Sequence, residues 1–216
     1  MNQSDGIAIA LAWPETFCKQ AGAWYDSLMF WLGINKSGYY QVGHAAIVLI
    51  DVSKGSCHYF DFGRYHAPHG FGRVRSATTD HDLNIRTNAI VKDGRIVNLN
   101  AILKELYGNP STHGTGTIYG TQIAINFREA FDMAIKMQER EFIAYGPFRF
   151  GGTNCSRFVN KVLRAGQLGV FNKVALHFPW MLTPTPMWNL TALKRDIECV
   201  DKNMGDDSQM IVPQAV

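Results

Sequence analysis

The chain has 216 residues, 46% of them hydrophobic and 18% charged, which is the composition of a folded globular protein and excludes an intrinsically disordered one. The formal net charge is only +3 and no Lys/Arg run exceeds two residues, so we expect neither a nucleic-acid-binding arm nor a polybasic membrane patch. No apolar run approaches the roughly 18 residues that cross a membrane.

The amino-terminal segment and the cysteines indicate the cellular compartment in which the protein is expected. The apolar residues 7–13 are few, follow no basic segment and end at Pro14, which indicates a buried strand rather than an export signal. The cysteines are scattered without short paired spacings, at Cys18, Cys57, Cys155 and Cys199. A reduced, cytoplasmic protein is therefore the expectation. Because no linker or repeat interrupts the chain, we expect one domain over residues 1–216.

The first part of the chain predicts strands and one helix. Strands are expected at residues 7–11, 44–51 and 57–62, and the second of these is so apolar that we expect it to be buried on both faces. Residues 16–31 carry apolar side chains at helical spacing and predict a helix. Residues 63–79 are rich in Gly, His, Arg and aromatic side chains and predict a long surface loop.

The middle of the chain predicts a second hairpin and another strand. Residues 83–91 and 95–99 flank a Lys-Asp-Gly turn and predict paired strands. A short helix is expected to end at Tyr107, and residues 117–125 predict a strand.

Two helices and an irregular tail are expected after that strand. Asn126 should cap a helix over residues 127–141, and Thr153 a helix over residues 153–165 that ends at Gly166. From about residue 170 the prolines predict a segment that wraps over the surface, and the last 15 residues should form a polar tail.

Cys155 is expected near the start of the last helix, after two glycines. In the first helical turn, unpaired N–H groups and the helix dipole favour negative charge, so a thiolate there has a lowered pKa. The same N–H groups can stabilise an oxyanion. We expect Cys155 to be a nucleophile; the alternative is an inert buried cysteine.

A cysteine nucleophile needs a base, and the base needs an orienting group. Of the seven histidines, His44 opens the buried strand at residues 44–51, where its side chain can point into a cleft. The alternative is a histidine at a strand end whose ring nitrogens are hydrogen-bonded and which has no catalytic role. The adjacent residues Asp80, His81 and Asp82 cannot converge on one ion, so we expect no metal site and no cofactor.

The orienting group should come from the strand next to His44. A tight turn at residues 53–54 would pair Ala46 with Asp61, which places Asp61 on the same face as His44. A register slip of one residue would bring other side chains to that face. We expect Asp61 to be the third residue. The alternatives are His58 and Tyr59.

Two short segments together resemble a known enzyme group. Gly-His-Ala-Ala-Ile-Val at residues 43–48 and Asn-Cys-Ser-Arg-Phe-Val at residues 154–159 resemble the motifs of circularly permuted papain-like hydrolases of the NlpC/p60 superfamily, including its lecithin–retinol acyltransferase-like branch. In that group the histidine strand precedes the cysteine helix. The resemblance implies an α+β, papain-like fold in which an antiparallel sheet or half-barrel packs against helices. It also implies a third residue on the strand after the histidine, which fits Asp61 or His58.

The resemblance implies a cysteine hydrolase that attacks an amide bond through a Cys155 thioester, with His44 as general base. Its partner would be a small peptide, amide or acyl substrate. A lipid acyltransferase or esterase with the same two residues is one alternative, and a non-catalytic binding protein on the same fold is another. Arginines in the predicted surface loop could favour an anionic substrate, although loop arginines are usually only solvated. They are Arg64, Arg73 and Arg75.

Overall fold

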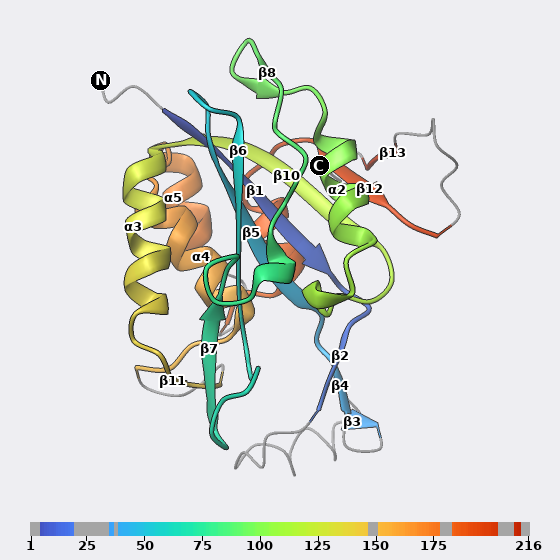
Figure 1. The fold of residues 1–216 in the computed structure, drawn as a ribbon, viewed down its shortest axis with the longest axis vertical. Helices are drawn as coiled ribbons and strands as arrows, with labels where there is room; N and C mark the ends of the chain where they lie inside the picture. The colour runs from blue at the N-terminus through green and yellow to red at the C-terminus, as the bar shows by residue number, and fades with distance from the viewer. Residues whose placement is uncertain are drawn as a thin grey trace.

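The structure is a computed structural model that describes residues 5–19, 35–36, 39–146, 151–177, 183–202 and 210–212. An eight-stranded sheet in the order β11-β7-β6-β5-β1-β10-β12-β13 forms its centre (Figure 1). Each pairing in this sheet is antiparallel. The expected α+β class, with an antiparallel sheet packed against helices, is confirmed.

The strands of this sheet are β1 Gly6–Trp13, β5 His44–Asp51, β6 Ser56–Gly63, β7 Phe71–Arg75, β10 Ile118–Ile125, β11 Ile143–Ala144, β12 Ile197–Val200 and β13 Met210–Val212. Smaller sheets join β2 Phe17–Lys19, β3 Asn35–Lys36 and β4 Tyr39–Gln41, and β8 Val91–Lys92 and β9 Arg95–Ile96. The helices are α2 Leu99–Tyr107, α3 Phe127–Gln138, α4 Cys155–Ala165, α5 Val170–His177 and α6 Pro186–Thr191, with 3-10 turns η1 His81–Leu83 and η2 Pro110–Thr112.

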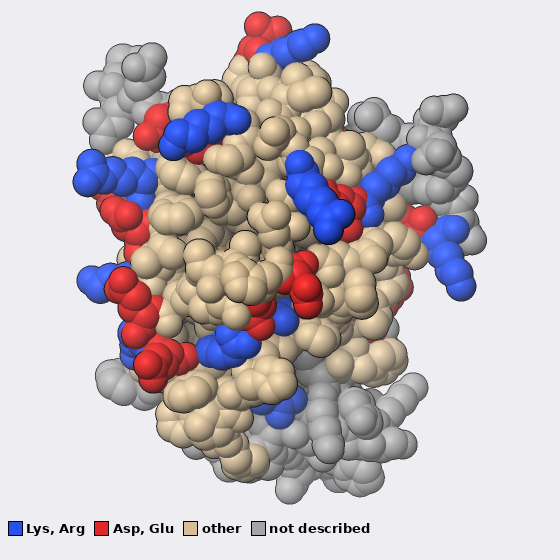
Figure 2. Space-filling view, in the orientation of Figure 1, with Lys and Arg blue, Asp and Glu red and all other residues tan. Residues whose placement is uncertain are grey.

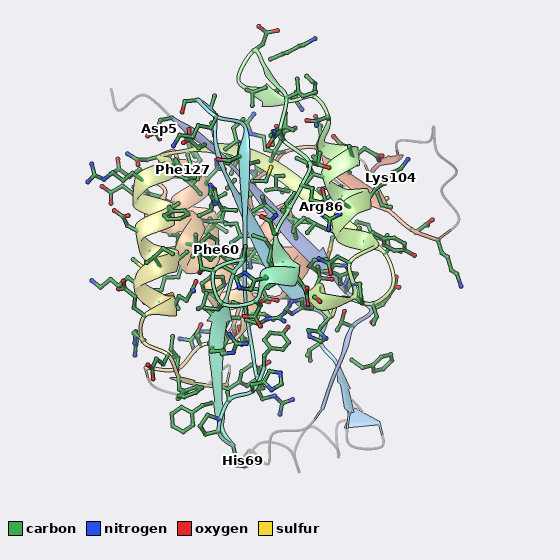
Figure 3. The ribbon with its side chains drawn as sticks, viewed as in Figure 1. Asp5, Phe60, His69, Arg86, Lys104 and Phe127 are labelled. Carbon is green, nitrogen blue, oxygen red and sulfur yellow. The ribbon has the colours of Figure 1, made fainter. Side chains whose placement is uncertain are left out.

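Helices cover both faces of the sheet, and β1 and β5 between them are buried almost throughout (Figure 1). The expected burial of β5 on both faces is confirmed. Alternate side chains of β5 enter two apolar clusters. Ala45 and Ile47 belong to the cluster that contains the buried side chains of α3 and α4, which we call the α4 cluster. Ala46 and Val48 belong to the cluster that contains the buried side chains of α2, which we call the α2 cluster. Phe60 of β6 also belongs to the α4 cluster, and Figure 3 shows it on the side of the sheet where α3 lies.

Strands β5 and β6 form the expected hairpin, with Ala46 opposite Asp61. That register is confirmed. The Gly55 N–H donates to the carbonyl oxygen of Asp51 at 2.8 Å, and Gly55 has a φ of +69°, which a residue with a Cβ rarely adopts. The turn therefore fixes which residues of the two strands face each other.

The predicted loop over residues 63–79 is wrong in its centre, where β7 pairs with β6. Phe62 lies opposite Val74 and Asp61 opposite Arg75. Val74 enters the α4 cluster, while the arginines on either side of it find carboxylate partners. This alternation of apolar and paired charged residues is what stabilises β7 as a strand.

The predicted hairpin over residues 83–91 and 95–99 is also wrong in extent, because β8 and β9 contain only two residues each. The preceding backbone bonds to side chains instead of to another strand. The Arg86 and Thr87 N–H groups donate to the Glu105 carboxylate at 2.7 and 2.9 Å. The buried apolar side chains of this segment pack into the α2 cluster, at Leu83, Ile85 and Ala89.

Two predicted helices need correction. The helix over residues 16–31 is wrong at residues 17–19, which form β2 against β4; residues 20–34 lie outside the described ranges. The helix after Asn126 ends at Gln138 rather than at residue 141. Its cap is confirmed, because the Asn126 Oδ1 accepts from the Glu129 N–H at 3.0 Å.

The segment from residue 170 does more than wrap over the surface. It supplies α5 and α6 on the α4 side and then β12, which pairs with β10 as part of the sheet. Within the expected polar tail, residues 210–212 form β13 against β12. No helix in the described parts of the chain is long and apolar enough to cross a membrane. Acidic and basic side chains are interspersed over the face shown in Figure 2.

Candidate active site

Cys155 is the first residue of α4, and Asn154 is the cap. The Asn154 Oδ1 accepts a hydrogen bond from the Arg157 N–H at 2.8 Å, and the Asn154 backbone is extended. The predicted cap, Thr153, is wrong because its backbone is engaged with the strand before it. The Thr153 N–H donates to Ala144 at 3.0 Å, and its carbonyl accepts from Gly146 at 3.0 Å. The helix can therefore begin only one residue later.

The cysteine is held in place by the buried side of α4. Phe158, Val159, Val162 and Leu163 are buried in the α4 cluster. Asn189 of α6 donates from Nδ2 to the Ser156 carbonyl at 2.8 Å, next to the cysteine. Apolar packing and this buried hydrogen bond fix the amino-terminal turn and with it the position of the sulfur.

His44 is the first residue of β5 and its side chain is buried. Gly43 before it has a φ of +73°, and a Cβ there would lie 3.0 Å from the Trp13 carbonyl oxygen. Only glycine fits this close approach without strain. His44 pairs with Trp13 across the sheet, and their ring centroids lie 5.6 Å apart. The indole therefore confines the imidazole on the β1 side.

Asp61 faces His44 from the adjacent strand. The Nε2 atom of His44 lies 3.4 Å from the Oδ2 atom of Asp61, and the carboxylate is inaccessible to solvent. Nε2 is not aligned for a hydrogen bond, so the contact is an ion pair at the outer limit of hydrogen-bonding distance. With Nε2 toward the carboxylate, Nδ1 is the ring nitrogen available to the Cys155 thiol.

The pKa values of His44 and Cys155 move in opposite directions. Burial alone would lower the pKa of His44, but the Asp61 carboxylate and the Cys155 thiol raise it from 6.5 to about 9. Burial alone would raise the pKa of Cys155, but a hydrogen bond to His44, its charge and the Ala45 N–H lower it from 9.0. Both shifts favour a thiolate–imidazolium pair.

The other described cysteines lack such an environment. Burial raises the pKa of Cys57 to about 11 and also raises that of Cys199. Among the described cysteines whose side chains are placed, only Cys155 has a lowered pKa. Its position at a helix start beside a histidine gives the physical cause.

The two alternative third residues take other places. His58 points to the opposite face of β6, where its ring lies 5.2 Å from that of Phe131. The Tyr59 hydroxyl donates to the Asp61 Oδ2 at 3.2 Å. Tyr59 therefore supports the carboxylate, and His58 takes no part in the arrangement around His44.

Arg75 has a role at this site that was not predicted from the sequence. Its Nε and Nη2 atoms donate to Oδ1 and Oδ2 of Asp61 at 3.0 and 2.6 Å, and only 3% of Arg75 is exposed. Arg73 pairs with Asp80 in the same two-pronged manner. The expectation that these are solvated arginines of a surface loop is therefore wrong, and their charges are engaged by carboxylates of the chain itself.

Tyr65, which follows β6, completes the surroundings of the carboxylate. The Arg75 guanidinium carbon lies 3.4 Å from the centre of the Tyr65 ring, and the His113 ring stacks on it at 5.0 Å. Burial, together with the charges of Asp61 and Cys155, raises the pKa of Tyr65. No group of three or more His, Cys, Asp and Glu residues in the described ranges could hold a metal ion.

The model of the family described as type VI secretion system effector TseH-like matches residues 8–168, well over half of the chain. The chain belongs to this family. In this TseH-like chain, the match includes His44, Asp61 and Cys155.

A solved structure shows that the likeness to TseH extends over nearly the whole chain. The crystal structure of the type VI secretion system effector TseH gives a TM-score of 0.63 at 18% identity, and the match covers 98% of this chain and 100% of that chain. At this identity the likeness shows a shared fold. A comparison with curated proteins gives no match.

Proposed function

We propose that this TseH-like protein is a cysteine hydrolase that cleaves an amide bond through a thioester on Cys155. One observation carries the proposal: inside a buried site, His44 lies 3.4 Å from the Asp61 carboxylate and lowers the pKa of the Cys155 thiol at the start of α4. This is the arrangement of nucleophile, base and orienting group that acyl transfer requires. The resemblance of the two motifs to permuted papain-like hydrolases supports the same reaction.

The reaction follows from the positions of these groups. The Cys155 thiolate attacks the amide carbonyl carbon, and the developing oxyanion accepts a hydrogen bond from the Cys155 N–H, which has no partner within the helix. The His44 imidazolium then gives its proton to the leaving amine as the C–N bond breaks. In the second half, His44 takes a proton from water, the hydroxide attacks the thioester, and the carboxylic acid product leaves the regenerated cysteine.

The family name bears on where the reaction takes place. An effector of a secretion system acts after export, so we infer that this protein leaves the cell that makes it. The cytoplasmic location expected from the sequence is not confirmed. Transfer of the acyl group to an alcohol or amine would use the same three residues. The difference from hydrolysis is that the alcohol or amine, in place of water, attacks the thioester.

The first experiment maps cysteine reactivity. Iodoacetamide at neutral pH should label Cys155 before Cys57 and Cys199, because only its pKa is lowered. His44→Gln should slow this labelling at least about tenfold, since one pKa unit changes the thiolate fraction tenfold. His58→Gln is the matched control and should leave the rate unchanged. Equal labelling of the three cysteines would contradict the proposal.

The second experiment identifies the reaction. The purified protein is incubated with a peptide library and with amide and ester substrates, and products and acyl-enzyme are followed by mass spectrometry. We expect new carboxylates from amides and an adduct at Cys155, both abolished by Cys155→Ser. Esterified products formed with an added alcohol would identify a transferase. No adduct and no product, with Cys155 selectively alkylated, would exclude the hydrolase.

A further inference from the structure

Arg75 is a buried cation whose hydrogen bonds converge on the candidate site. It donates two hydrogen bonds to the Asp61 carboxylate and a third, at 3.0 Å, to the Ser111 carbonyl of η2. The Tyr65 ring covers the guanidinium at 3.4 Å. A guanidinium with fixed partners on three sides holds a carboxylate in one orientation as well as neutralising its charge.

Three neighbouring strands align these groups. Ala46 of β5, Asp61 of β6 and Arg75 of β7 are successive cross-strand partners, and His44 lies two residues from Ala46 on the same face. The carboxylate therefore has the imidazole on one side and the guanidinium on the other. Its Oδ2 atom lies 3.4 Å from His44 Nε2 and 2.6 Å from Arg75 Nη2.

A carboxylate this deeply buried needs such a partner to remain ionised. Burial raises the pKa of Asp61, and the interactions with His44 and Arg75 reverse that effect and lower it. Without Arg75, the Tyr59 hydroxyl would be the remaining hydrogen-bond donor to the carboxylate among the described residues, besides the longer contact with His44. The titratable and charged groups around Asp61 are His44, Tyr59, Tyr65, Arg75 and His113.

We propose that Arg75 is a positioning residue of the site: it keeps Asp61 an oriented carboxylate, and Asp61 in turn stabilises the imidazolium of His44 opposite the Cys155 thiolate. This inference rests on the proposed function and deepens it. Arg75 touches neither the sulfur nor the imidazole in any described contact, so we expect its effect to pass through Asp61, to which it donates two hydrogen bonds.

The chain provides a matched control on the same strand. Arg73 lies two residues before Arg75, on the same face of β7, and holds Asp80 with two hydrogen bonds of 2.8 and 2.7 Å. Asp80 is part-exposed and has no described contact with His44 or Cys155. Arg73 also donates from Nε to the Tyr65 carbonyl at 2.8 Å, so the control variant is Asp80→Asn, which weakens this second ion pair and leaves Arg73 and its bond to Tyr65 in place.

The experiment measures the rate of Cys155 alkylation by iodoacetamide from about pH 5 to about pH 9, where the thiolate fraction sets the rate. Asp61→Asn should raise by about one unit the pH at which the alkylation rate increases. At a pH below that increase, labelling should therefore be about tenfold slower than in the wild type. Arg75→Met should produce the same shift, Arg75→Lys a smaller one, and Asp80→Asn none. Thermal unfolding of each variant records any loss of stability separately.

The double variant Asp61→Asn/Arg75→Met tests the route of the effect. If Arg75 acts through Asp61, the double variant should match Asp61→Asn alone, and removing both charges should also restore stability that Arg75→Met loses. An unshifted Arg75→Met profile, or an equal further shift in the double variant, would overturn the inference. If Arg75→Met does not fold, an unshifted Arg75→Lys profile overturns it.

The outcome also separates this inference from the proposed function. If wild-type Cys155 reacts no faster than Cys57, or if Asp61→Asn leaves the profile unchanged, the proposed site itself is wrong. If both behave as expected and only the Arg75 variants retain the wild-type profile, the hydrolase proposal stands and the role of Arg75 is structural.

Discussion

The His44 imidazole and the Asp61 carboxylate face each other across two adjacent strands, with 3.4 Å between Nε2 and Oδ2 and both side chains buried. The distance is set by the β5–β6 register, in which Asp61 lies opposite Ala46. Two groups that carry opposite charges inside the protein make its stability depend on pH.

The first prediction concerns that dependence. The folded pKa of His44, about 9, lies above the unfolded value of 6.5. The protonated ring therefore stabilises the folded state fully below pH 6.5, and this contribution is lost as the pH rises through 9. The free energy of unfolding lost in His44→Gln should shrink by up to about 3 kcal/mol from about pH 6 to about pH 9 in urea titrations. A loss that is constant with pH would contradict the shift.

The second prediction concerns the cap of α4. Asn154→Ala removes the acceptor of the Arg157 N–H and should destabilise the protein by about 1 kcal/mol in urea unfolding. It should also slow alkylation of Cys155, because the first turn loosens. Asn126→Ala removes the equivalent bond to Glu129 in α3 and is the control. It should lose similar stability while Cys155 reacts at the wild-type rate; equal slowing in both variants would refute the link to the cap.

The third prediction concerns Gly63, over which Tyr65 folds back. A Cβ at Gly63 would collide with the Tyr65 ring. Gly63→Ala should therefore cost about 1–3 kcal/mol in the free energy of unfolding, since an overpacked site must rearrange. At Gly169 a Cβ meets nothing within 4 Å, so Gly169→Ala should be close to neutral. Equal stabilities of the two variants would show that Tyr65 moves aside freely.

The fourth prediction concerns the buried amide that links α6 to α4. Asn189 donates to the Ser156 carbonyl at 2.8 Å and accepts from Asn160 at 3.2 Å. Asn189→Leu leaves buried polar atoms without these partners and should destabilise the protein by about 1–3 kcal/mol, measured by thermal or urea unfolding. A variant as stable as wild type would mean that the neighbouring helices adjust to satisfy those atoms.

The sequence was most informative where local chemistry sets the geometry. The apolar run of β5 and the turn before β6 determine the register, so the position of Asp61 next to His44 could be predicted. The start of α4 was misplaced by one to two residues because Thr153 and Asn154 are both good caps. The parallel bridge between Thr153 and Tyr145, a tertiary contact, decides between them.

The sequence was least informative where a strand carries charges inward. Phe71–Arg75 contains two arginines and a glycine, which are unfavourable for a buried strand, so it was predicted to be part of a loop. Its stability comes from carboxylates elsewhere in the chain, Asp61 and Asp80. Charged and apolar residues alternate at Arg73, Val74 and Arg75, and this period of two is typical of a strand. The carboxylates that pair with the two arginines, however, are brought near them only by the fold.

The proposed nucleophile and the Asp61 carboxylate reach His44 from different layers of the protein. Cys155 belongs to the α4 cluster on one side of the sheet, whereas Tyr59, which supports Asp61, belongs to the α2 cluster on the other. The proposed thiolate–imidazolium pair therefore requires both layers to be packed against the sheet. In a partly folded chain Cys155 would have the pKa of an ordinary thiol, so the proposed reactivity would appear only when folding is complete.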